Sequence, residues 1–177
     1  LCESKSYQFE PVPIRARVTP PVIPDRTDWA ANDATLYIQD IYSGPGLAGV
    51  PRGEVAGLRI FTYGYAYRMT GSHDALAIEG GWDTKRILGT VPVEEDGSVM
   101  VKIPHSRPLS LQPVDKQGRA LQVMRSWLAA QPGEQVSCVG CHEPSRNAPV
   151  PQPTLASNKA PKELTPLARS RTRRPAS

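Results

Sequence analysis

Apolar and polar residues alternate in several short stretches that begin at residue 34. Residues 34–42 place Leu36 and Ile38 on one face. Residues 55–63 alternate in the same way around Arg59. A period of two is typical of a half-buried strand, so both stretches are predicted to be β-strands.

The clearest local signal lies between residues 86–93 and residues 98–103. Both runs alternate, and the segment 94–97 between them ends in Asp96-Gly97. An Asp-Gly turn between alternating apolar runs is typical of a β-hairpin. The sequence therefore predicts that these two runs pair with each other.

Further strands are predicted downstream. Leu109 and Leu111 alternate in one, and a turn at residues 115–118 leads into another over residues 120–127. Residues 64–84 are irregular and are expected to form a long loop. Short strands, closely spaced turns and the lack of a helical period indicate a mainly β fold, an antiparallel β-sandwich or open barrel with long loops.

Composition and charge add two constraints. The 177 residues include 19 prolines and 14 glycines, which favours turns and extended segments over long helices. The net charge of +4 arises at the end of the chain, where six Lys/Arg and one acid from Lys159 onward give +5. This stretch has no aromatic residues for stacking on bases, so a solvated tail is expected rather than nucleic-acid binding. No run of apolar residues is long enough to span a membrane.

The strongest chemical signal is Cys138-Val139-Gly140-Cys141-His142. Two cysteines three positions apart, followed at once by histidine, are typical of c-type haem attachment. The thiols reach the two vinyl groups of a porphyrin and the imidazole ligates the iron. We expect one covalent haem c, with Cys138 and Cys141 as anchors and His142 as the proximal iron ligand.

Two other interpretations of the motif remain open. A zinc site needs four ligands, and the adjacency of Cys141 and His142 makes it awkward for one metal to bind both of them together with Cys138. A redox-active Cys-X-X-Cys pair belongs at a helix start after a parallel strand, a context that the sequence does not predict. Haem attachment is favoured over both.

A second iron ligand cannot be assigned from the motif. Met69 and His73 lie in the predicted loop 64–84, where a distal ligand or lid is most often placed, and they are the distal candidates. An open iron would favour small-molecule chemistry, whereas two ligands would favour electron transfer. The remaining histidine and methionines are His105, Met100 and Met124.

The start of the chain bears on its location. It opens Leu1-Cys2-Glu3-Ser4, without an initiator methionine or an apolar run typical of a signal peptide. Since c-type haem is attached outside the cytoplasm in bacteria, we expect a piece of a longer exported protein, periplasmic or otherwise extracytoplasmic. Cys2 is the third cysteine, left over as a thiol or a metal ligand.

Three regions are predicted. Residues 1–33 form an extended proline-rich strap packing on the domain, since five prolines fall between Pro11 and Pro24. Residues 34–144 form the β-rich haem-binding domain. Residues 145–177, rich in Pro, Ser, Ala and Arg, form a disordered linker or tail.

Several separated stretches, in order, resemble the middle domain of the hydrazine synthase alpha subunit, a c-type haem domain of large exported proteins of planctomycete type. The likeness extends over roughly residues 1–150. The stretches that carry it are 89–98, 108–113, 121–127 and 132–144.

The resemblance implies a mostly β domain with one c-type haem at Cys138 and Cys141. In hydrazine synthase that haem is catalytic and joins two nitrogen atoms. There the histidine of the motif turns to a zinc ion held with an earlier cysteine, and a tyrosine four residues later ligates the iron. Cys2 is placed like that cysteine, but Arg146 occupies the tyrosine position, which favours iron ligation by His142.

The function expected first is electron transfer with neighbouring domains of the same longer chain or with a redox partner protein. One alternative is a catalytic haem acting on a small nitrogen compound. Another is a non-enzymatic module that holds haem, or zinc through Cys2 and His142.

Overall fold

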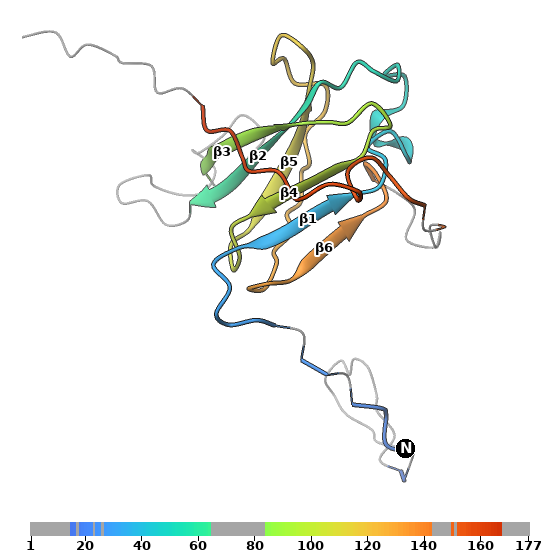
Figure 1. Cartoon of the computed structure of the whole chain (residues 1–177), viewed down its shortest axis with the longest axis vertical. Coiled ribbons are helices and arrows are strands. Elements are labelled where there is room, and N and C mark those ends of the chain that lie inside the picture. The colour runs from blue at the N-terminus through green and yellow to red at the C-terminus, as the bar shows by residue number, and fades with distance from the viewer. Residues whose placement is uncertain are drawn as a thin grey trace, which may run out of the picture.

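Two three-stranded sheets face each other around one core (Figure 1). The structure is a computed structural model, which describes residues 15–16, 18–22, 24–25, 27–64, 84–142, 150 and 152–167. Within these residues the only helix is the 3-10 turn η1, Pro45–Leu47, too short to cross a membrane. The predicted fold class, a mainly β sandwich, is confirmed.

The first sheet has the order β4-β1-β6. Its strands are β1 (Ala34–Ile38), β4 (Val99–Ile103) and β6 (Gln135–Cys138). β1 runs antiparallel to β4 and parallel to β6, so it is the central strand. Alternate residues of β1 are buried, as the sequence predicted.

The second sheet has the order β3-β2-β5 and is antiparallel throughout. It consists of β2 (Gly57–Gly64), β3 (Thr84–Pro92) and β5 (Leu109–Val114). The register between β2 and β3 shifts between Ile60 and Phe61, which marks a bulge.

The inward side chains of both sheets form a single core. Full burial of one Leu or Ile stabilises a fold by about 1.5–3 kcal/mol, so this cluster is the main source of stability. Its largest fully buried members are Leu36, Ile41, Leu58, Ile60, Ile103 and Leu109.

The predicted hairpin is wrong in its pairing. The turn at 94–97 forms, with the Gly97 N–H donating to the Glu94 carbonyl at 2.9 Å. The strands on either side then separate, because β3 pairs with β2 and β4 pairs with β1. The turn therefore joins the two sheets instead of closing a ladder.

The strand predicted over residues 120–127 does not form. This segment follows β5 through hydrogen bonds at intervals, from the N–H groups of Leu121, Met124 and Leu128 to the carbonyls of Pro113, Leu111 and Leu109. The spacing of three and four residues is too irregular for a ladder. The short strand β6, which the sequence analysis did not predict, supplies the third strand of the first sheet instead.

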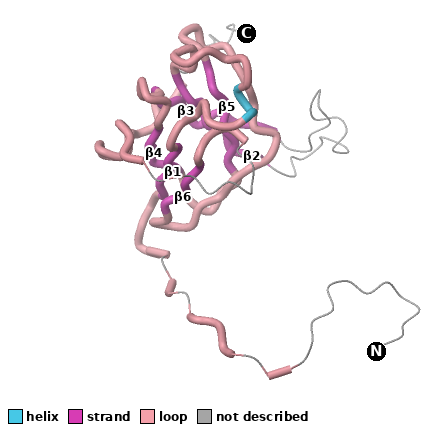
Figure 2. Tube along the Cα trace, turned by 90° about the vertical axis from the view of Figure 1, so that its right-hand side faces the viewer, coloured by secondary structure: helices cyan, strands magenta, loops and turns pink. Residues whose placement is uncertain are grey.

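The N-terminal stretch differs from the expected packed strap. Val18 and Val22 are 92% and 90% exposed, and Figure 2 shows this stretch leading away from the strands. Nearer the domain, the Asp28 N–H donates to the Pro132 carbonyl at 3.0 Å. The predicted loop 64–84 lies outside the described residues between 65 and 83.

Residues 154–165, here called the C-terminal clasp, lie against both sheets, contrary to the expectation of a disordered tail. Lys162 bridges to Val101 of β4, and Thr165 bridges to Thr90 of β3. In Figure 1 this segment, in red, passes between β3 and β4. Ala156, 4% exposed, is buried in the contact.

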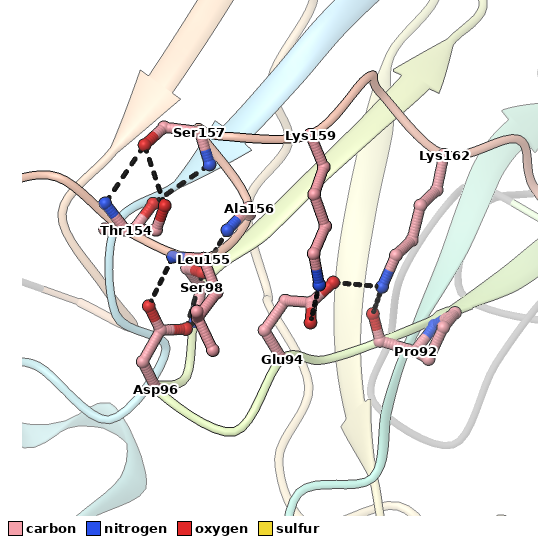
Figure 3. Close-up of polar contacts among 10 residues, drawn as sticks. All are labelled: Pro92, Glu94, Asp96, Ser98, Thr154, Leu155, Ala156, Ser157, Lys159 and Lys162. Atoms are coloured by element: carbon pink, nitrogen blue, oxygen red, sulfur yellow. Dashed lines mark hydrogen bonds and ion pairs between the residues drawn. The ribbon is translucent and has the colours of Figure 1, made fainter.

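Polar contacts fix the clasp to the turn between the sheets (Figure 3). Lys159 Nζ lies 2.7 Å from Glu94 Oε2, and Lys162 Nζ lies 2.5 Å from Glu94 Oε1. The Leu155 N–H donates to Asp96 Oδ2 at 2.7 Å. The turn that the sequence assigned to a hairpin is thus the docking point of the clasp.

Candidate functional site

The cysteine motif begins at the end of the edge strand β6. Cys138 is the last residue of β6 and pairs with Ile38 of the central strand. Val136 and Cys138 are half-buried and pack on the core, while the alternate residues Gln135 and Ser137 are exposed. The first thiol therefore belongs to the inner face of the sheet, at its open edge.

Backbone hydrogen bonds continue beyond the strand into the motif. The Gln39 N–H donates to the Cys138 carbonyl at 3.0 Å. The Asp40 N–H donates to the Val139 carbonyl at 2.9 Å. The segment after β1 therefore holds the first half of the Cys-X-X-Cys loop by its main chain, whatever the side chains bind.

The second half of the loop is held by close backbone approach. The Gly46 N–H donates to the Cys141 carbonyl at 3.0 Å. A Cβ on Gly140 would lie 2.3 Å from the Ser43 carbonyl oxygen and 2.5 Å from that of Asp40. Only glycine fits at that separation, so Gly140 lets the loop lie directly on the segment after β1.

His142 leaves this contact with an unusual backbone. Its φ of 64° is in the left-handed region, and its side chain is exposed. A non-glycine residue there is uncommon and marks a turn in the chain. The imidazole is thus presented outside the core, next to the half-buried Cys141.

A charged pair supports the segment after β1. Arg52 Nη2 donates to Asp40 Oδ2 at 2.6 Å and Nη1 donates to Oδ1 at 3.2 Å. The guanidinium carbon lies 5.0 Å from the centroid of the Tyr42 ring. The Tyr42 hydroxyl in turn accepts the N–H groups of Gly53 and Val55, at 2.8 and 2.9 Å.

The two thiols of the motif lie against the apolar core. Cys138 and Cys141 are both half-buried and pack on it. In the part of the chain that the structure describes, no three His, Cys, Asp or Glu side chains are placed to hold a metal ion. Other partly buried residues that pack on the same core include Val136, Leu121, Met124 and Leu128.

The other residues singled out from the sequence divide into those outside the described part of the chain and those within it. Cys2, Met69, His73 and Arg146 lie outside the described residues. Met100 is partly buried between inward neighbours on β4, on the outer face of its sheet. Met124 packs against the same core as the two cysteines.

The residues that hold the motif in place were not predicted from the sequence. The Asp40–Arg52 pair and the contacts of the Tyr42 hydroxyl carry no local signature, because the partners are 11 to 13 residues apart. Gly140 appeared in the sequence only as a spacer in the motif, and Gly46 was not singled out.

The model of the hydrazine synthase alpha subunit middle domain matches residues 53–143, which is more than half of the chain. The chain belongs to this family. The matched region starts one residue after Arg52 and ends one residue after His142, so it contains strands β2 to β6 and the complete motif.

A solved structure of the hydrazine synthase from Kuenenia stuttgartiensis agrees with this family membership. It matches 63% of the chain at 23% identity, with a TM-score of 0.50, which shows a shared fold. The match covers 18% of the Kuenenia chain, so this middle domain corresponds to a small part of that protein. No curated protein sequence matched the chain.

Proposed function

We propose that this hydrazine synthase-type middle domain carries one c-type haem, attached through Cys138 and Cys141, with His142 as an iron ligand. It would serve electron transfer within a longer extracytoplasmic protein, between neighbouring domains of that chain or with a redox partner. When bound, the haem supplies one-electron chemistry.

The observation that carries the proposal is the way the five motif residues are held. Both thiols are half-buried at the edge of the first sheet, and His142 is exposed beside them. Main-chain hydrogen bonds to Cys138 and Cys141 fix the loop at its backbone. A loop fixed in this way would hold the two cysteines and His142 at constant spacing for the cofactor.

Each residue has a separate task in this scheme. Cys138 and Cys141 would anchor the porphyrin through thioether bonds, at a place where both residues pack on the core. His142, on its left-handed backbone, offers its imidazole beyond the loop. An electron would enter or leave at the exposed edge of the first sheet.

The first test is covalent haem content. The protein, produced with a periplasmic cytochrome maturation system, should give a c-type pyridine haemochrome spectrum. The double variant Cys138→Ser/Cys141→Ser should give none, while Cys2→Ser should keep it. A wild-type protein that folds but carries no covalent haem under these conditions would refute the proposal.

The second test concerns the iron. His142→Ala should change the spectrum of the loaded protein strongly if His142 ligates iron. An unchanged spectrum, with zinc lost from the variant on metal analysis, would instead assign His142 to a zinc ion together with Cys2. The exposed imidazole on a turn of the chain is the feature that makes this second assignment worth testing.

The family relationship favours one further candidate function, a catalytic haem that acts on a small nitrogen compound. This function requires an open coordination position on the iron. Carbon monoxide binding to the reduced protein would support this candidate, whereas a six-coordinate iron that excludes carbon monoxide would favour electron transfer.

A further inference from the structure

Asp40 contacts the Cys-X-X-Cys loop twice through its backbone. Its N–H donates to the Val139 carbonyl at 2.9 Å. Its carbonyl oxygen lies where a Cβ on Gly140 would come within 2.5 Å. A shift of the Asp40 main chain would therefore move both residues between the two cysteines.

The Asp40 side chain is fixed by Arg52. Both carboxylate oxygens accept from the guanidinium, at 2.6 and 3.2 Å, and Oδ1 also accepts the Tyr42 N–H at 3.1 Å. The hydrogen bond to Asp40 raises the pKa of Arg52. A two-point pair fixes orientation as well as distance.

Arg52 is itself attached at two further places. Its Nη1 donates to the Asp96 carbonyl at 3.1 Å, in the turn between the sheets. Its guanidinium carbon lies 5.0 Å from the centroid of the Tyr42 ring. Arg52 thus ties the segment that supports the motif to the turn where the two sheets connect.

We propose that Asp40 and Arg52 are positioning residues for the haem-attachment loop. They hold Val139 and Gly140 so that the thiols of Cys138 and Cys141 can both react with the same edge of the porphyrin. This proposal rests on the proposed haem function. It adds a specific role for two residues outside the motif.

Loss of the Asp40–Arg52 pair is expected to affect the motif loop more than the stability of the whole domain. The Arg52 side chain is 56% exposed and that of Asp40 is 27% exposed. An ion pair that open to water adds little to overall stability, with about 0–1 kcal/mol the usual range. Its loss should loosen the motif loop while the core of the two sheets stays folded.

A second Arg–Asp pair serves as the control for this test, with a more buried carboxylate, since the Asp115 side chain is 2% exposed. Arg119 Nε lies 2.6 Å from Asp115 Oδ2 in the turn after β5, on the other sheet. The Arg119 side chain is 72% exposed. Arg52→Gln and Arg119→Gln therefore each remove one Arg–Asp pair, but only the first pair supports the motif.

The first measurement uses protein produced without haem. Alkylation by iodoacetamide is followed at each cysteine by peptide mass spectrometry. In Arg52→Gln the rates at Cys138 and Cys141 should rise about threefold to tenfold, since exposure of thiols follows the population of the locally open form. Arg119→Gln should leave both alkylation rates unchanged. Arg52→Lys keeps the positive charge but cannot make the two-point contact, so its rates should be intermediate between those of Arg52→Gln and wild type.

The second measurement uses the haem-loaded protein. Arg52→Gln should shift the reduction potential and increase the fraction of haem held by a single thioether, while Arg119→Gln should match the wild type. Equal alkylation rates and equal potentials in Arg52→Gln and wild type would overturn the positioning role. If the wild type takes up no haem, the proposed function fails, and the alkylation rates still decide the role of Arg52.

Discussion

Gly46 and Cys141 meet at a distance that leaves no room for a side chain. The Gly46 N–H donates to the Cys141 carbonyl at 3.0 Å, and a Cβ on Gly46 would lie 2.6 Å from that same oxygen. The second cysteine is therefore placed by a glycine almost a hundred residues earlier in the chain. Its position depends on how the loop after β1 folds.

Gly140→Ala should lower both stability and haem attachment. The new Cβ would lie 2.3 Å from the Ser43 carbonyl oxygen, and backbone cannot move aside cheaply. We expect a loss of about 1–3 kcal/mol in the free energy of unfolding, measured by urea denaturation, together with reduced haem content.

Gly49→Ala is the comparison for that variant. Gly49 also has a backbone that favours glycine, with φ of 85°, but a Cβ there meets nothing within 4 Å. Alanine should cost about 1–2 kcal/mol for the left-handed conformation alone and leave haem attachment unchanged. Equal haem loss in both variants would show that the close approach of Gly140 does not matter for attachment.

Local sequence pattern predicted most strands but not their partners. The alternation in residues 34–42 and 98–103 correctly gave half-buried strands, and the turn at 94–97 formed. An Asp-Gly turn fixes only the local reversal of the chain. The run after the turn, β4, pairs with β1 in the first sheet, where Leu36 and Ile38 lie opposite it. The run before the turn, β3, pairs with β2 in the second sheet.

Spacing alone makes Cys138, Cys141 and His142 the candidate site, and their role in haem attachment stays a prediction. The residues that support them could not be predicted. β6 is only four residues long and pairs in parallel with β1, about a hundred residues away, so nothing near it in sequence indicates a strand. Arg52 and Asp40 are related only through the fold, as ion pairs between loops usually are.

Hydrogen exchange will test the irregular segment beside β5. The amides of Leu121, Met124 and Leu128 donate to carbonyls of the neighbouring segment at 2.9 Å each. These three amides should exchange slowly. The exposed residues Ser126 and Trp127 lie between Met124 and Leu128, and their amides should exchange faster. Protection at every second residue over 120–127 would instead indicate that these residues form the β-strand predicted from their alternation.

Ala156→Asp will test whether the C-terminal clasp is part of the folded domain. Ala156 is 4% exposed, and its N–H donates to Ser98 Oγ at 3.0 Å. A carboxylate at this position would be buried without a partner, and we expect a loss of about 3 kcal/mol or a clasp that detaches. Leu155→Gln is the control, because Leu155 is 43% exposed and should tolerate a polar side chain that adds no charge beside Asp96. Equal stability of both variants, with equal resistance of the clasp to proteolysis, would argue against its packing.

Glu94 should make the attachment of the clasp dependent on pH. Hydrogen bonds from Lys159 and Lys162 hold the pKa of Glu94 below its ordinary value, although burial opposes them. A carboxyl whose pKa is lower in the folded state stabilises that state above its unfolded pKa, about 4.5. The contribution is lost as the pH falls through the folded pKa, where the carboxyl takes up a proton.

Glu94→Gln isolates this contribution. At pH 7 the variant should be less stable than the wild type by about 1 kcal/mol, since Lys159 and Lys162 are partly exposed and their ion pairs are screened. The difference should shrink below pH 4.5 and vanish once Glu94 is protonated in the folded wild type. Asp96 also has a lowered pKa, because hydrogen bonds from Ser98 and Leu155 outweigh its burial, but it is present in both proteins and cancels in the comparison. Thermal unfolding of the pair between pH 3 and 7 measures the effect, and a difference that stays constant across that range would exclude Glu94 as its source.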